Sequence, residues 1–473
     1  MKGVLSLADF RRCGELVVNP GAPMPVEVAD PAVSIDSRKV EEGGIFVALT
    51  GERMDGHRFV EDVFRRGALL AVVSREWFEA SGSPLPPPRR GILVVRDTVL
   101  GLQQLATIYR ESFGIPVVGV GGSNGKTTTK EMLGAVLSTA FRVHMSYANL
   151  NNHLGVPLTL LSMRQDTEIA VVEMGINHPG EMELLASIAR PTHGLLTNIG
   201  HEHLEFLVDL DGVKRAERTL FSFLDESGGI IFVNNDDPRL CDAAVDPRRH
   251  ILYGMNDGGG CQFRAGAVSV LADGALKFTL HFPRGDEEIR LNFTGRHNAL
   301  NALAAATVGM FFGIELPDIR RGLEGLLPQE GWKRLEVVSA GGITILNDTY
   351  NANPDSMRLA IDALIDIPCR GRRLAVIGDM LELGSAGPSE HAATGRYLAG
   401  RNVDVIFSFG DLAGSVCRLN PERCRGHFTS REKLFDAVSA ELGEGDAVLF
   451  KGSRGMKLEE TVAAILAART TNS

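Results

Sequence analysis

The stretch Ile115-Pro-Val-Val-Gly-Val-Gly-Gly-Ser-Asn-Gly-Lys126-Thr127-Thr128-Thr129 carries most of the information about fold and site. Its apolar first half is typical of a buried parallel strand, and its glycines form a turn before a helix that starts at the lysine. Backbone N–H groups in such a turn converge on phosphate, and the lysine adds a positive charge for the outer phosphate oxygens. The stretch therefore predicts an ATP site whose nucleotide-contacting residues are Gly122, Ser123, Asn124, Gly125, Lys126, Thr127 and Thr128.

Apolar strand-like runs alternate with helix-length segments in the sequence that follows this loop. Beyond it, such runs occupy residues 169–173, 194–199 and 229–234, and a second set occupies 374–378, 403–409 and 447–451. The segment from Cys261 to Phe293 instead alternates around the turn Ala272-Asp273-Gly274, which predicts a β-hairpin inserted in the central part.

These patterns predict an α/β protein of three domains, as expected for 473 residues. We expect a small N-terminal α/β domain, a central P-loop ATPase domain with a parallel sheet, and a C-terminal Rossmann-like α/β domain. The predicted boundaries are residues 1–98, 99–327 and 328–473.

Composition excludes several classes of partner. The net charge of -10 gives the whole chain no electrostatic reason to bind nucleic acid or an anionic membrane. No apolar stretch reaches the roughly 18 residues that a membrane span needs, so we expect a cytoplasmic protein without membrane insertion. The six cysteines are scattered, with no C-x-x-C pair, and are predicted to be reduced thiols.

Two further positions suggest metal chemistry beside the loop. Glu173 ends the apolar run 169–173, at the edge of a parallel sheet where ligands bind, and a carboxylate there suits Mg²⁺. The hydroxyl of Thr127 directly follows the loop lysine and can bind the same ion. His203 follows another strand, but histidine is an unusual Mg²⁺ ligand, so the residues alone favour a structural role for it.

Six motifs, in order, resemble those of the Mur ligases, and within them those of the branch that adds D-alanyl-D-alanine. They are Gly-Ser-Asn-Gly-Lys-Thr-Thr at 122–128, Asn149-Leu-Asn-Asn-His-Leu-Gly-Val-Pro, Val172-Glu-Met-Gly, Thr197-Asn-Ile-Gly with His203-Leu-Glu, Gly295-Arg-His-Asn298-Ala-Leu-Asn301, and Asn347-Asp-Thr-Tyr350-Asn-Ala-Asn353-Pro-Asp-Ser356. The resemblance implies an ATP-dependent amide ligase that adds D-alanyl-D-alanine to UDP-N-acetylmuramoyl-tripeptide through an acyl phosphate. Such an enzyme serves peptidoglycan synthesis, and through it cell shape and division.

The resemblance also assigns roles to individual residues. It implies that Lys126 holds the outer phosphates, that Thr127 and Glu173 hold one Mg²⁺, and that His203 helps to hold a second, which reverses the structural interpretation of this histidine. The implied catalytic residues are Lys126, Glu173, His203 and Glu217. The implied nucleotide contacts outside the loop are Asn298, Asn301, Arg334 and Asp348. The implied substrate contacts are Ser37, Arg38, Asp55 and His57 for the uridine diphosphate, and Asn151, Asn152, Tyr350, Asn351 and Asn353 elsewhere.

The chain departs from the family pattern at two positions. Glu217 stands where the family commonly has a carbamylated lysine, so a native carboxylate is expected to replace the carbamate; a modified Lys214 in a shifted register is the alternative. Gly121 stands where threonine is common, which removes a hydroxyl near the phosphates.

Two other functions stay open from the sequence. One is a Mur-type ligase that uses another amino acid or dipeptide, and the other is a P-loop nucleotide switch that couples ATP to partner binding. We expect the chain to act as a monomer.

Overall fold

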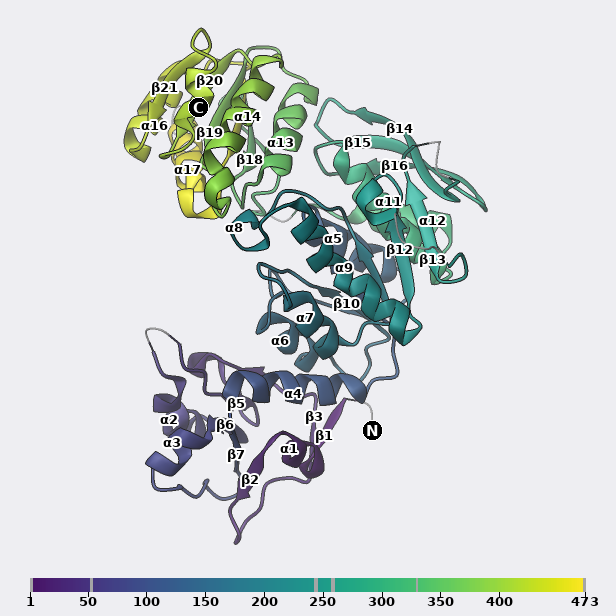
Figure 1. The fold of residues 1–473 in the computed structure, drawn as a ribbon, viewed down its shortest axis with the longest axis vertical. Helices are drawn as coiled ribbons and strands as arrows, with labels where there is room; N and C mark the ends of the chain where they lie inside the picture. The colour runs from purple at the N-terminus through teal and green to yellow at the C-terminus, as the bar shows by residue number, and fades with distance from the viewer. Residues whose placement is uncertain (1–2, 52–53, 242–245, 257–259, 329–330, 471–473) are drawn as a thin grey trace.

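The protein is described by a computed structural model that covers residues 3–470, except 52–53, 242–245, 257–259 and 329–330. Three main sheets follow one another along the chain and form three lobes, from the purple N-terminal lobe through the teal central lobe to the green and yellow C-terminal lobe (Figure 1). The predicted three-part α/β architecture is therefore confirmed. The sheets fall within residues 15–95, 117–291 and 336–451, and the boundaries at residues 98 and 327 remain a proposal.

The N-terminal lobe contains a five-stranded sheet in the order β2-β7-β6-β5-β4, parallel except for β2. Its buried strands place short 3-10 turns at the carboxyl ends of β4 and β5, each turn capped by an aspartate. The elements are β1 Val4–Ser6, α1 Leu7–Cys13, β2 Glu15–Val18, β3 Glu27–Ala29, β4 Val33–Ser34, η1 Ser37–Lys39, β5 Ile45–Val47, η2 Gly56–Phe59, α2 Val60–Arg65, β6 Leu70–Ser74, α3 Arg75–Ala80, β7 Gly91–Val95 and α4 Thr98–Glu111.

The central lobe contains a nine-stranded sheet in the order β16-β15-β14-β13-β12-β11-β8-β10-β9. Strands β8, β10 and β11 are parallel neighbours, and their register pairs Glu173 with Val120 and Leu196 with Gly121. Because all three end at the same edge, the segments that follow them meet there. The elements up to β12 are β8 Val117–Gly121, α5 Lys126–Leu137, β9 Val143–Met145, α6 Gly155–Leu161, β10 Ile169–Glu173, α7 Glu181–Ala189, β11 His193–Leu196, α8 Leu204–Leu207, α9 Leu210–Ser227 and β12 Ile230–Asn234.

The predicted hairpin is present, with a third strand added. Strands β14 and β15 pair antiparallel around the turn at 271–275, where Gly274 has a φ of 84°, and β16 pairs with β15. This meander extends the parallel sheet because β14 pairs with β13. The remaining elements of the lobe are α10 Pro238–Cys241, β13 His250–Gly254, β14 Phe263–Val270, β15 Leu276–Phe282, β16 Gly285–Leu291, α11 His297–Phe311 and α12 Leu316–Gly325.

The C-terminal lobe contains a six-stranded sheet in the order β17-β18-β22-β19-β20-β21, parallel except for β17. Asp348 at the end of β18 pairs with Lys451 at the end of β22, so both lie at the carboxyl edge. The elements are β17 Glu336–Ala340, β18 Ile343–Asp348, α13 Pro354–Asp366, β19 Arg373–Gly378, η4 Gly384–Ala386, α14 Gly387–Ala399, β20 Val405–Phe409, α15 Gly414–Arg418, β21 Cys424–Phe428, α16 Arg431–Glu441, β22 Ala447–Lys451, η5 Arg454–Met456 and α17 Leu458–Thr470.

The prediction that all six cysteines are reduced thiols is wrong for one pair. Cys417 and Cys424 form a disulfide, with Cα atoms 5.2 Å apart. The chain leaves α15, turns and returns as β21, and this return brings together two cysteines that are seven residues apart. The spacing rule for C-x-x-C pairs does not detect such a return. Across the described residues, no helix combines the length and apolarity needed to cross a bilayer.

Candidate functional site

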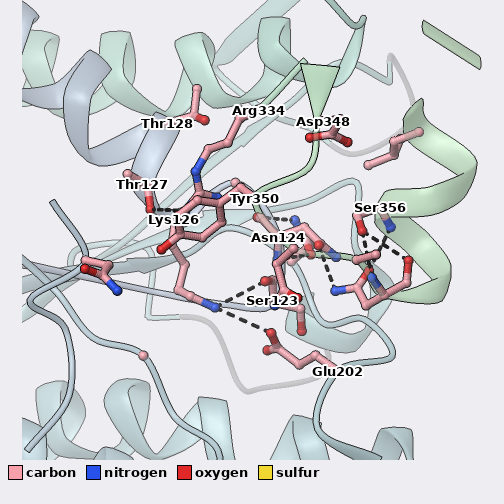
Figure 2. Close-up of a pocket in the computed structure, with 18 of the residues that line it drawn as sticks. Ser123, Asn124, Lys126, Thr127, Thr128, Glu202, Arg334, Asp348, Tyr350 and Ser356 are labelled. Atoms are coloured by element: carbon pink, nitrogen blue, oxygen red, sulfur yellow. Dashed lines mark hydrogen bonds and ion pairs between the residues drawn. The ribbon is translucent and has the colours of Figure 1, made fainter. Parts of the chain in front are cut away.

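A polar cavity of about 450 Å³ lies where the carboxyl edges of the central and C-terminal sheets face each other (Figure 2). The central lobe contributes the phosphate loop, Glu173 and the start of α11. The C-terminal lobe contributes Arg334, the segment after β18 and Lys451. Of the predicted site residues, those lining the cavity are Ser123, Asn124, Gly125, Lys126, Thr127, Thr128, Asn151, Asn152, Glu173, His203, Asn298, Asn301, Arg334, Asp348, Tyr350, Asn351 and Asn353.

The phosphate loop has the conformation that the sequence predicts. Gly122 and Gly125 have φ angles of 106° and 87°, which glycine adopts without strain. A Cβ on Gly122 would lie 2.4 Å from Thr197 Oγ1, so close packing also requires glycine there. Lys126 begins α5 and donates to the Gly122 and Ser123 carbonyls. Its ammonium group is therefore held inside the loop.

Acidic neighbours govern the charge of Lys126. Burial by itself would lower the pKa of this amine, but Glu202, Glu217 and Glu173 outweigh burial and raise it. The ammonium lies 3.5 Å from Glu202 Oε2. The loop thus presents a permanent positive charge, as the binding of a triphosphate requires.

Glu173 lies at the centre of a group of polar contacts at the end of β10. Its Oε1 accepts hydrogen bonds from Thr127 Oγ1 at 3.0 Å and from Asn151 Nδ2 at 2.8 Å. The fully buried Lys130, one helical turn after the loop lysine, lies 3.9 Å from Oε2 and donates to the Ser146 carbonyl at 2.8 Å. Lys130 therefore ties Glu173 to the segment that carries the cavity's asparagines.

The residues around Glu173 fit a magnesium ion. Glu173 Oε2 is buried and accepts no hydrogen bond among the described residues, which leaves a charged oxygen available to a cation. Over all the residues that the structure describes, no group of three or more His, Cys, Asp or Glu side chains has a metal-binding arrangement. Mg²⁺ in nucleotide sites is commonly held by only one or two protein groups, with phosphates and water completing the shell. Thr127 and Glu173 could supply those two groups.

Glu217 on α9 is fully buried beneath the phosphate loop. Its Oε2 accepts a hydrogen bond from the Gly122 N–H at 2.8 Å, whereas its Oε1 has no hydrogen-bond partner among the described residues. Burial raises the pKa of this carboxyl to about 8, with Lys126 acting in the opposite direction. A Cβ on Gly121 would lie 2.9 Å from Glu217 Oε2, so the glycine leaves room for this carboxylate. The two departures from the family pattern are therefore in contact.

Arg334 reaches the phosphate loop from the C-terminal lobe. Its Nη2 donates to Thr127 Oγ1 at 3.1 Å, and its guanidinium carbon lies 3.9 Å from the centre of the Tyr350 ring. Asp348 accepts from the Leu335 N–H at 3.2 Å, and the Tyr350 N–H donates to the Lys333 carbonyl at 3.0 Å. The end of β18 thus hydrogen-bonds to the chain on both sides of Arg334 and holds this segment in place.

Three more contacts join the two lobes at the cavity. Asn353 caps α13 and donates through Nδ2 to Asn124 Oδ1 at 2.9 Å. His203 Nδ1 lies 2.8 Å from Glu382 Oε2, and His201 Nδ1 lies 3.0 Å from Asp355 Oδ2. The imidazole of His203 is thus next to a carboxylate of the C-terminal lobe.

Asn298 and Asn301 lie on one face of α11, as their spacing predicts. The Asn301 Nδ2 group donates to Asn298 Oδ1 at 2.9 Å, and Asn298 donates to the Thr294 carbonyl at 2.7 Å. A Cβ on Gly125 would lie 2.8 Å from Asn301 Oδ1. The two asparagines of α11 therefore lie next to the phosphate loop, with Asn301 beside Gly125.

The four predicted uridine diphosphate contacts do not line this cavity. Ser37 and Arg38 lie in η1 after β4, and the exposed Arg38 side chain pairs with Asp36 at 2.8 Å. His57 is buried, its Nδ1 lies 2.6 Å from Asp55 Oδ1, and its Nε2 accepts from the Ser74 N–H at 2.9 Å. Both ring nitrogens are thus engaged within the N-terminal lobe.

Several lining residues had no individual role predicted from the sequence. Glu202 pairs with Lys126, Lys451 Nζ lies 2.7 Å from Asp348 Oδ2, and burial lowers the pKa of His297 to about 4. A buried lysine at the end of a strand, next to an aspartate at the end of the neighbouring strand, is a usable signal for Lys451. Nothing in the local sequence distinguishes Glu202 or His297 from surface polar residues.

Three consecutive parts of the sequence match parts of one family. Residues 32–110 match the "Mur ligase family, catalytic domain", residues 120–309 the "Mur ligase middle domain", and residues 333–454 the "Mur ligase, glutamate ligase domain". The UDP-N-acetylmuramoyl-tripeptide–D-alanyl-D-alanine ligase of Bacillus subtilis is 38% identical over 437 residues, which cover 91% of this chain and 92% of that protein. The chain belongs to the Mur ligase family.

Other relatives of this Mur ligase are similar over comparable lengths. The ligase of the same name from Escherichia coli is 35% identical and covers 92% of the chain and 93% of its own length. The crystal structure of MurF from Acinetobacter baumannii superposes with a TM-score of 0.84 at 31% identity, covering 98% of this chain and 99% of that one. MurF from Thermotoga maritima, solved in complex with ADP, superposes with a TM-score of 0.81 at 28% identity, over 94% and 99% of the two chains.

Proposed function

We propose that this Mur ligase joins D-alanyl-D-alanine to UDP-N-acetylmuramoyl-tripeptide with hydrolysis of ATP to ADP and phosphate, as part of peptidoglycan precursor synthesis. The relatives that match more than nine-tenths of the chain carry this name. The observation that carries the proposal is a single cavity in which the phosphate loop, Glu173 and Arg334 of the other lobe converge. We also propose that the chain acts as a monomer; its need for ATP and a nucleotide-linked precursor is consistent with the cytoplasm.

In the proposed reaction, the terminal carboxylate of the tripeptide attacks the γ-phosphate of ATP, ADP leaves, and an acyl phosphate forms. Lys126, the loop N–H groups and Arg334 stabilise the charge on the transferring phosphoryl group. A magnesium ion bound by Thr127 and Glu173, with His203 near a second ion, would neutralise phosphate charge when present. Asn298 and Asn301 would contact the adenine of ATP, and Asp348 would contact its ribose.

The second step needs an enclosed site. The amine of the dipeptide attacks the carbonyl of the acyl phosphate, and phosphate leaves from the tetrahedral intermediate. Water would hydrolyse the acyl phosphate, so contacts that bring the two lobes together protect it. Asn353 to Asn124 and Arg334 to Thr127 are such contacts. We propose that Asn151, Asn152, Tyr350 and Asn351 face the tripeptide and the amine. We also propose that Ser37 and Arg38 hold the diphosphate, that Asp55 contacts another part of the uridine diphosphate, and that buried His57 orders that segment.

Glu217 takes a positioning role in this proposal. Its carboxyl group accepts a hydrogen bond from the Gly122 N–H below the loop, where the family pattern suggests a carbamate. Lys214 lies three residues earlier on α9, and the hydrogen bond from the Gly122 N–H to Glu217 supports the choice of Glu217.

Mass spectrometry of the product would test the proposed function. Wild-type protein with ATP, the UDP-linked tripeptide and D-alanyl-D-alanine should form the pentapeptide product, and single amino acids should not replace the dipeptide. Lys126→Ala should reduce the rate by at least about 100-fold, because the loop loses its charge at the transferring phosphoryl. Product with a different amine, or ATP hydrolysis that ignores both substrates, would overturn the assignment.

A further inference from the structure

The C-terminal wall of the cavity ends in an arginine for which the proposed chemistry has no use so far. Arg454 begins η5, three residues after Lys451 ends β22. Its side chain is exposed, and within the described part of the chain no carboxylate lies within 4.0 Å of its guanidinium nitrogens. An exposed cation at the mouth of a polar cavity is suited to an anionic substrate group.

The backbone around Arg454 is fixed to the cavity wall. The preceding Ser453 is buried; its N–H donates to the Asp379 carbonyl at 2.9 Å, and its hydroxyl accepts from the Leu381 N–H at 2.9 Å. The same hydroxyl donates to the Ala352 carbonyl at 3.3 Å. Leu381 and Ala352 both line the cavity, so Arg454 is attached to its rim rather than to a remote surface.

The other cations of the cavity already have partners. Lys126 pairs with Glu202, and Lys451 pairs with Asp348. Arg334 donates to Thr127, beside the position where the γ-phosphate would bind. Among the described residues, these three lining cations therefore have partners already. Arg454 is available to bind a second anionic group of a substrate on the C-terminal side of the cavity.

The Tyr350 ring sets an upper limit on the distance between the two arginines. The guanidinium carbon of Arg334 lies 3.9 Å from the ring centre and that of Arg454 lies 5.5 Å from it, so their separation is at most the two distances combined. An extended dipeptide spans at most about 7 Å, and a single amino acid about half of that. A dipeptide with its amine near Arg334 and the phosphate loop can therefore place its carboxylate near Arg454.

We propose that Arg454 binds the free carboxylate of the incoming dipeptide. This inference rests on the proposed function. Arg454 donates to the carboxylate through its guanidinium fork, while the Tyr350 ring packs against the arginine and limits its motion. The amine at the other end of the dipeptide is then directed toward the acyl phosphate.

The test compares D-alanyl-D-alanine with its C-terminal amide, which lacks the negative charge. For wild-type protein, Arg454→Ala and Arg454→Lys, kcat/KM for each amine is measured at saturating ATP and tripeptide. We expect the wild type to prefer the acid by about tenfold to a hundredfold, the range of a hydrogen bond to a charged group. Arg454→Ala should lose most of this preference because its kcat/KM falls for the acid and not for the amide. The preference of Arg454→Lys should lie between those of the wild type and Arg454→Ala.

Controls separate this inference from the proposed function. Arg370 is exposed in the segment before β19, at the opposite end of the same sheet, so Arg370→Ala should leave both amines and the KM for ATP unchanged. Wild-type protein that forms no product with the dipeptide would contradict the proposed function itself. Wild-type activity combined with equal effects of Arg454→Ala on acid and amide, or with no effect on either, would overturn the role of Arg454 alone.

Discussion

The buried carboxyl of Glu217 should make the stability of the protein depend on pH. The side chain is fully buried, and burial raises its pKa from 4.5 to about 8 in the folded protein. Between these pH values the folded state keeps the proton that the unfolded state has lost. The contribution of Glu217 to the free energy of unfolding therefore falls as pH rises from about 4.5 to about 8, and it changes no further above that range.

The size of the effect follows from the shift. Each unit of pKa difference corresponds to roughly 1.4 kcal/mol, so the full penalty at pH 8 is on the order of a few kcal/mol. Glu217→Gln cannot ionise and can still accept from the Gly122 N–H through its amide oxygen. We expect the variant to be more stable than wild type at pH 8 by a few kcal/mol and nearly equal to it at pH 4.5.

Urea unfolding of both proteins at several pH values between 4.5 and 8.5 would measure this difference. Other groups titrate in both proteins, so the difference between the two curves isolates Glu217. Parallel curves, with the same offset at every pH, would show that Glu217 does not hold an extra proton in the folded state.

Two other substitutions test contacts around the site and in the C-terminal lobe. Tyr350→Leu removes the ring beneath Arg334 and should lower kcat/KM by about two- to thirtyfold, the range of a cation–π contact, whereas Tyr350→Phe keeps the ring and should stay within about twofold; equal losses in both would point to the hydroxyl instead. Cys417→Ala opens a short disulfide loop and should cost about 2–3 kcal/mol of stability in the C-terminal lobe, and Cys369→Ala, outside the disulfide, should respond to reductant as wild type does. Thermal unfolding with and without reductant checks this, and a wild-type midpoint that reductant does not change would contradict it.

The sequence by itself determined the local elements and their order. The run before the loop lysine is continuous and apolar, and it forms β8, while the glycines and Lys126 form the turn and the start of α5. Strand β22 has the predicted bounds, residues 447–451. These features depend on hydrophobic periodicity and on the backbone freedom of glycine, both of which act over a few residues. The phosphate loop and Glu173 could therefore be placed at one sheet edge without coordinates.

Only the tertiary structure decided which distant residues meet. Arg334 contacts Thr127 across 207 positions, Glu217 lies against Gly121 and Gly122, and Cys417 pairs with Cys424. Each contact depends on how two elements pack against each other. Packing is set by the sum of many weak interactions along both elements rather than by the residues near either partner. For the same reason, the short sequence around Arg454 does not reveal that its guanidinium lies beside Tyr350 at the edge of the cavity.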